Sequence, residues 1–205
     1  MRDIVVIEYM SVDGVIQAPG HAGEDTDGGF AHGGWTGPYT AEHHRYISEA
    51  FQTAGAFLLG RRTYEIFAEY WPTVTDENDE IAPALNTLPK YVASTILTEP
   101  QWTRTTIIGE VVQDVSKLKR EPGRRIIVVG SSGLTRTLIE HGLVDEYQLW
   151  VHPVVLGTGK RLFTEETPMT ALRLVDSKTT PNGLIILTYA PAVPMPPRRP
   201  VSSAR

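Results

Sequence analysis

The stretch Ile126–Ile139, IIVVGSSGLTRTLI, constrains the fold more than any other part of this chain. Four β-branched residues run into a Gly-Ser-Ser-Gly turn, and apolar residues at helical spacing follow it. A strand, a tight turn and a helix in this order direct free backbone N–H groups and a positive helix end toward one point. The stretch therefore predicts an α/β fold with a turn suited to an anion.

A second unit of this kind occurs earlier in the chain. Ala56–Gly60 reads as a buried strand and runs into a helical segment, Arg61–Tyr70, that begins with two arginines. Either unit alone is compatible with an ordinary strand-to-helix connection. Two such units, one of them carrying arginines, favour a ligand with several phosphates.

Composition narrows the class of protein. The 205 residues suit one domain, and the net charge of −5 argues against a broad nucleic-acid surface. The chain has no cysteine, which excludes disulfides, thiolate metal sites and a cysteine nucleophile. We see neither a signal-peptide core nor an apolar run of membrane length, so we expect a cytoplasmic protein that does not bind membranes.

Helical and strand patterns alternate early, and strand patterns dominate late, which predicts a mostly parallel sheet with an antiparallel C-terminal edge. The predicted strands are Ile4–Tyr9, Ala56–Gly60, Lys90–Ser94, Thr105–Ile108, Ile126–Val129, Val144–Pro153, Ala171–Asp176 and Leu184–Tyr189. The predicted helices are Ala41–Ala54 with Thr40 as N-cap, Arg61–Tyr70, Asp76–Leu88 bent by Pro83, Val111–Lys119 and the segment after Gly133. We expect one domain over 1–190 and a disordered Pro/Arg-rich tail over 191–205.

Several common site motifs are absent. Gly157–Lys160 resembles the end of a P-loop, but Arg161 replaces the Ser or Thr that would hold magnesium. The serines near Gly130 do not form a nucleophile elbow. His21, His32, His43 and His44 lack the spacing of a zinc site, so we predict no metal site.

Four segments together resemble a known family. They are Ser11-Val12-Asp13-Gly14 after the first strand, Gly60–Glu65, Ser94-Thr95 after a strand, and Val129–Leu134. Their order and spacing are similar to the dihydrofolate-reductase-like superfamily. The branch that contains the reductase domain of the bacterial riboflavin-biosynthesis deaminase-reductase is the most similar, and the segments 142–147 and 153–159 are typical of it.

The resemblance covers Met1 to Ala190. It implies an eight-stranded, mixed, mostly parallel sheet with flanking helices, and NADPH along the carboxyl ends of the strands. The cofactor residues that it implies are Gly60, Arg61, Arg62, Thr63, Ser94, Thr95, Gly130, Ser131, Ser132, Gly133, Leu134 and Thr135. Arg61 or Arg62 would pair with the 2′-phosphate.

The same resemblance places the substrate beside the segment after the first strand. Ser11 and Gly14 are the predicted substrate contacts there, and Trp35 is a third, from the Gly- and His-rich loop that could form a lid. Asp13 is the predicted catalytic residue, although a turn carboxylate beside a glycine is an equal interpretation. Glu8 is a weaker candidate.

One departure from the family argues against folate as the substrate. Glu42 and Glu49 lie where dihydrofolate reductases carry a pterin-facing acid, but both positions suit a surface residue. We therefore expect an NADPH-dependent reductase of a small heterocyclic or carbonyl/imine compound.

The alternative is a non-catalytic nucleotide- or phosphometabolite-binding protein, because the sequence offers no convincing buried acid. A metal-dependent hydrolase is the least favoured hypothesis. The family resemblance also implies a possible homodimer, to which Trp150, Val151 and Val155 could contribute if they are not core residues.

Overall fold

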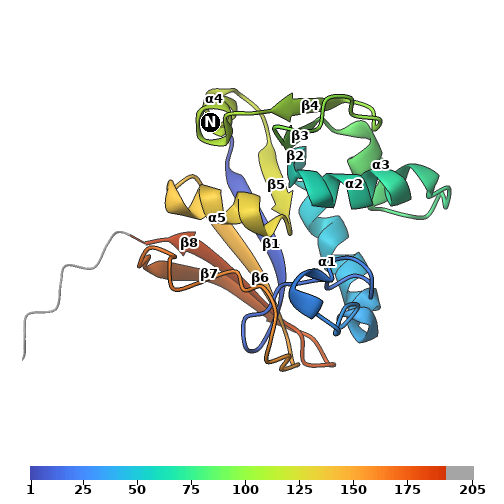
Figure 1. Ribbon diagram of the computed structural model, residues 1–205, viewed down its shortest axis with the longest axis vertical. Helices are drawn as coiled ribbons and strands as arrows, with labels where there is room; N and C mark the ends of the chain where they lie inside the picture. The colour runs from blue at the N-terminus through green and yellow to red at the C-terminus, as the bar shows by residue number, and fades with distance from the viewer. Residues whose placement is uncertain (193–205) are drawn as a thin grey trace, which may run out of the picture.

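The computed structural model describes residues 1–192, which form one eight-stranded sheet with helices on both faces (Figure 1). The strands are β1 (Ile4–Ser11), β2 (Ala54–Gly60), β3 (Lys90–Ala93), β4 (Thr105–Ile108), β5 (Arg125–Val129), β6 (Glu146–His152), β7 (Leu172–Thr179) and β8 (Ile185–Pro191). The α-helices are α1 (Thr40–Gln52), α2 (Arg61–Tyr70), α3 (Ala82–Thr87), α4 (Val111–Arg120) and α5 (Ser132–Glu140).

The strand order is β4-β3-β2-β5-β1-β6-β8-β7. All neighbours from β4 to β6 are parallel, whereas β8 runs antiparallel to both β6 and β7. This arrangement confirms the predicted mixed sheet and its antiparallel C-terminal edge. The sheet also places β1 at its centre, with β5 on one side and β6 on the other.

The residues of β1 alternate between two apolar cores. Ile4 and Val6 pack on the side of α4 and α5, and Val5 and Ile7 pack on the side of α1, α2 and α3 (Figure 1). Because side chains alternate along a strand, the next residue, Glu8, lies on the α5 side. A carboxyl group thus continues a row of fully buried aliphatic side chains.

The predicted helix Asp76–Leu88 is wrong in its first half. The side chain of Asp79 accepts hydrogen bonds from the backbone N–H groups of Ile81 (2.8 Å) and Ala82 (2.7 Å), which forms a turn there instead. The helix begins only at Ala82. Pro83 lies in its first turn, where a missing N–H is tolerated, and so does not bend it.

The start of α1 and the end of β8 also differ from the prediction. Thr40 has helical backbone angles and its hydroxyl donates to the carbonyl of Gly37 (2.8 Å), so Tyr39 holds the N-cap position of α1. Pro191, which the sequence assigns to the tail, belongs to β8. The rest of the predicted tail, residues 193–205, lies outside the described residues. Within residues 1–192, every helix is too short or too polar to cross a membrane.

Candidate active site

A cavity of about 650 Å³ lies across the carboxyl ends of the five parallel strands β1 to β5. Strand ends, the first turns of helices and the loop after β1 all contribute to its wall. Its volume is in the usual range for ligand sites, and this edge of an open α/β sheet is where such folds bind ligands.

Helices α2, α4 and α5 begin at the cavity wall, and α2 and α5 follow the two turns that the sequence singled out. Helix α2 starts at Arg61 directly after Gly60, and α5 starts at Ser132 directly after Ser131. No side chain caps the backbone N–H groups of either helix within the described chain. Both first turns therefore present free donors and the positive ends of their dipoles to the cavity.

Ser131 connects these two helix starts. Its backbone is left-handed (φ 59°, ψ 48°), a conformation that non-glycine residues rarely adopt. In this position its hydroxyl oxygen accepts a hydrogen bond from the N–H of Gly60 (2.9 Å) and lies 3.0 Å from the hydroxyl oxygen of Thr63. The two turns are thus held at a fixed distance by one side chain.

The structure brings all but one of the predicted cofactor residues to this cavity. The residues in the wall are Gly60, Arg61, Arg62, Thr63, Ser94, Thr95, Gly130, Ser131, Ser132, Gly133 and Leu134. Thr135 is fully buried behind the wall, where its hydroxyl donates to the carbonyl of Gly130 (2.9 Å). The fold thus brings these residues together at one cavity, and their role toward a cofactor stays a prediction.

Two glycines leave room for an anion at these turns. A Cβ atom added at Gly133, in the first turn of α5, or at Gly109, before α4, would meet no atom within 4 Å. Both residues line the cavity. The wall thus has a bare backbone where a phosphate would approach the helix starts, and these residues fit a dinucleotide.

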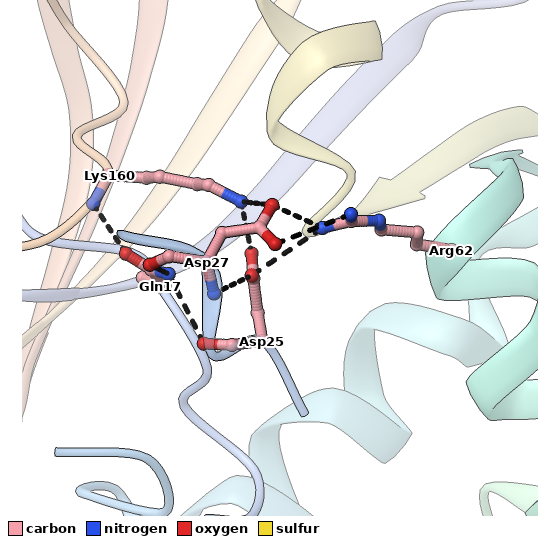
Figure 2. A network of polar contacts seen from close by, with 5 residues as sticks. All are labelled: Gln17, Asp25, Asp27, Arg62 and Lys160. Atoms are coloured by element: carbon pink, nitrogen blue, oxygen red, sulfur yellow. Dashed lines mark hydrogen bonds and ion pairs between the residues drawn. The ribbon is translucent and has the colours of Figure 1, made fainter. Parts of the chain in front are cut away.

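The arginines at the start of α2 already have carboxylate partners. Arg61 pairs with Glu65 (2.7 Å) on the same helix. Figure 2 shows that Arg62 instead reaches Asp27 in the loop after β1, at 2.6 Å. Hydrogen bonds from Arg62, and then from Lys160, lower the pKa of Asp27 to about 2.

Lys160 and Gln17, which both line the cavity, complete this network (Figure 2). The ammonium group of Lys160 contacts Asp25 (2.5 Å) and Asp27 (2.9 Å). The buried side chain of Gln17 donates to the carbonyls of both aspartates and accepts from the backbone N–H of Lys160 (3.0 Å). The acidic loop is thereby attached to two cations, Arg62 and Lys160, and both of them line the cavity.

Glu8 is a buried acid in the cavity wall. It is only 2% exposed, and its Oε1 atom has no hydrogen-bond partner within the described chain. Burial raises its pKa from 4.5 to about 8, although a hydrogen bond with Thr135 partly opposes that shift. At neutral pH this carboxyl group is therefore mostly protonated.

The predicted substrate residues lie elsewhere. Ser11, Asp13 and Gly14 do not line the cavity. The carboxylate of Asp13 accepts hydrogen bonds from the hydroxyl of Ser11 (2.7 Å) and from the N–H groups of Leu156 and Gly157. These bonds, that of Ser11 first, lower the pKa of Asp13 to about 2. They are what a turn carboxylate would make, and the catalytic role of Asp13 stays a prediction.

Trp35 also lies outside the cavity wall. Its indole N–H donates to the carbonyl of Gln17 (2.8 Å), and its ring packs edge-on against His152 (5.1 Å). His152 is fully buried at the end of β6, with its Nε2 atom 2.7 Å from that of His43. Burial, and then His152, lowers the pKa of His43 to about 4.

Sequence reasoning missed this pair, because nothing links positions 43 and 152 until the chain folds. Trp150, suggested as a possible interface residue, is 1% exposed and belongs to the core. Among residues 1–192, no three His, Asp or Glu side chains are grouped so that they could hold a metal ion.

The fold and this cleft define a protein of the dihydrofolate-reductase-like class. The chain belongs to the family of the RibD C-terminal domain, whose model matches residues 2–186. It is 34% identical over 134 residues to the uncharacterized protein YyaP of Bacillus subtilis, covering 64% of this chain and 71% of that protein.

Two solved structures show the same fold. A putative riboflavin biosynthesis protein from Shewanella sp. PV-4 has a TM-score of 0.64 at 16% identity, with 94% of this chain and 100% of that chain covered. A diaminohydroxyphosphoribosylaminopyrimidine deaminase/5-amino-6-(5-phosphoribosylamino)uracil reductase from Thermotoga maritima has a TM-score of 0.60 at 11% identity. That alignment covers 93% of this chain and 57% of the other.

Proposed function

We propose that this protein is an NADPH-dependent reductase of a small heterocyclic or carbonyl/imine compound. The observation that carries the proposal is the pair of uncapped helix starts on one cavity, joined by Ser131. The name of the Thermotoga maritima relative, a reductase of a substituted uracil, supports a heterocyclic substrate.

The residues of the cleft have separate tasks in this proposal. The first turns of α2 and α5 would bind the pyrophosphate, and Arg62 or Arg61 would pair with a further phosphate. Bound NADPH would supply the hydride, so the protein needs no nucleophile of its own. Its residues have to orient the two reactants, exclude water and provide a proton.

The alternative of a binding protein without turnover depends on the lack of a convincing buried acid in the sequence. Glu8 is a buried acid and lies in the cavity wall. The main argument for the alternative is therefore removed, and the reductase hypothesis is the better supported of the two.

Calorimetric titration of the protein with NADPH and with NADH tests the proposal. We expect Gly133→Val to abolish NADPH binding while the protein stays folded, because the added side chain would enter the open cavity without a left-handed backbone to strain it. Gly133→Ala should have a smaller effect. Gly37→Ala, at a glycine with equally free surroundings outside the cavity wall, is the control.

Arg62→Ala tests the expected preference for NADPH. Loss of a charge-assisted contact of about 1.5–3 kcal/mol should weaken the binding of NADPH by roughly ten-fold or more, and the binding of NADH much less. Equal affinities of the wild-type protein for the two nucleotides, or unchanged NADPH binding in Gly133→Val, would contradict the proposal.

A further inference from the structure

Packing alone does not explain why a glutamate occupies position 8. It follows four aliphatic residues of the central strand, all with 0% exposure, and it is 2% exposed itself. A buried carboxyl group without full hydrogen bonding costs free energy that an aliphatic residue would not. Its Oε1 atom has no partner in the described chain, and Glu8 lines the cavity, so a bound ligand is placed to supply a hydrogen-bond partner.

The location of Glu8 relative to the anion-binding turn is fixed by the backbone. The preceding residue, Ile7, accepts a hydrogen bond at its carbonyl from the N–H of Gly130 (3.2 Å). Glu8 therefore lies beside Gly130, where the turn that leads into α5 begins. Glu8 and Gly130 line the same cavity. A ligand whose phosphates bound at this turn would extend toward or past Glu8.

We propose that Glu8 is the proton donor to the substrate in this cleft. This inference rests on the proposed reductase function. The acceptor is a carbon–nitrogen or carbon–oxygen double bond of the substrate.

The step balances in atoms and electrons. A hydride from a bound dihydronicotinamide adds to carbon, and the π electrons of the double bond move to the nitrogen or oxygen. That atom takes the proton of the Glu8 carboxyl group. The nicotinamide is oxidised, the substrate is reduced, and Glu8 is left as a carboxylate that regains a proton from water.

The charged groups of the cavity leave Glu8 as its neutral acid. Arg61, Arg62 and Lys160 line the wall, but Arg61 is paired with Glu65, and Arg62 and Lys160 are paired with Asp25 and Asp27. On the α5 side, the group that contacts Glu8 is the hydroxyl of Thr135. The position opposite Glu8 on β6 is Leu149, which is apolar. Burial then keeps the proton on Glu8 at the pH at which a donor is needed.

A pair of matched substrates isolates the proton step. The first probe is 3,4-dihydroisoquinoline, a neutral imine that needs both hydride and proton. The second is its N-methyl iminium cation, which needs the hydride only. With NADPH near pH 8, Glu8→Gln should reduce the neutral imine at least ten-fold more slowly than the wild-type protein and reduce the cation at a similar rate.

Two further variants support the comparison. Glu8→Asp keeps an acid at the site and should restore part of the lost rate. Glu140→Gln removes an exposed carboxylate from the far end of α5 and should change neither reaction. Equal slowing of both probes in Glu8→Gln, or no slowing of either, would overturn the assignment, as would a wild-type protein that binds NADPH but reduces neither probe.

A measurement without ligand gives an independent readout. The infrared C=O stretch of a protonated carboxyl group should be present in the wild-type protein at pH 7, disappear with a midpoint near 8, and be absent in Glu8→Gln. Its absence from the wild-type protein at pH 7 would also overturn the assignment. NADPH titration separates the two hypotheses: failure to bind NADPH removes the proposed function together with the proton step, whereas failure of the imine comparison alone removes only the role of Glu8.

Discussion

Glu8 and Asp13 come from the same short segment, one inside β1 and the other in the turn after it, yet their carboxyl groups have opposite environments. Asp13 is surrounded by donors, and its pKa is lowered to about 2. Glu8 is buried with few donors, of which the Thr135 hydroxyl is one, and burial raises its pKa to about 8. An acid held by backbone N–H groups stabilises a loop as a carboxylate, whereas an acid deprived of donors keeps its proton and can deliver it.

The largest expected effect is the contribution of Glu8 to the pH dependence of the free energy of unfolding. Because the folded state keeps a proton that the unfolded state releases above about 4.5, the free energy of unfolding should fall as pH rises from about 5 to 8. The shift corresponds to a loss on the order of 4 kcal/mol. Glu8→Gln should lack this loss, and urea unfolding of both proteins at several pH values measures the difference. If the free energies of unfolding of the wild-type protein and Glu8→Gln changed in parallel with pH, Glu8 would not differ from Asp13 in the way described.

Asp13→Asn should have the next largest effect, with the opposite dependence on pH. The amide nitrogen cannot accept a hydrogen bond, so at least one bond from Ser11, Leu156 or Gly157 is lost, at about 1–2 kcal/mol. The folded-state pKa is lowered, so the wild-type advantage should be present above pH 4 and disappear as pH falls toward 2.

Rates measured on the same Asp13→Asn variant decide between the two carboxyl groups. We expect imine reduction and its decline near pH 8 to stay as in the wild-type protein. If turnover instead falls ten-fold while the free energy of unfolding is unchanged, Asp13 has the catalytic role that the sequence suggested.

Thr135→Val should produce the smallest effect. The hydrogen bond with Thr135 lowers the pKa of Glu8, so its removal should raise that pKa further. The alkaline decline of the rate should then move to slightly higher pH. Ser116→Ala removes a comparable hydroxyl, which donates to a helix carbonyl on α4, and serves as the control. A shift to lower pH would contradict the environment that we assign to Glu8.

The fold could largely be predicted from the sequence, whereas the environments of these two carboxyl groups could not. The strand-to-helix units and the antiparallel edge were predicted, since each depends on local patterns such as the glycine turn before α5. The family resemblance named residues that the fold brings together at one cavity, and their role toward a cofactor stays a prediction. A sequence does not show which carboxylate will find donors, because Leu156 and Gly157 reach Asp13 only after folding.

Glu8 does carry a signal in the sequence. It is an acidic residue at the end of the run Ile4–Ile7, in a strand expected to be buried on both faces. Charged residues are rarely buried without a reason, so the strand pattern alone makes such a position a candidate for function. Contacts between distant segments, such as Arg62 with Asp27, carry no comparable signal.

The contact between Arg62 and Asp27 affects how an anionic ligand can enter the cavity. An anionic ligand that reaches Arg62 has to displace Asp27, so one ionic partner is substituted for another and little net charge is neutralised. The displaced carboxylate belongs to the loop that Asp25 and Asp27 attach to Lys160. Release of the loop and binding of such a ligand are then thermodynamically coupled, so each favours the other. A substitution that removes the competing carboxylate but keeps the arginine, such as Asp27→Ala, should therefore tighten the binding of such an anion.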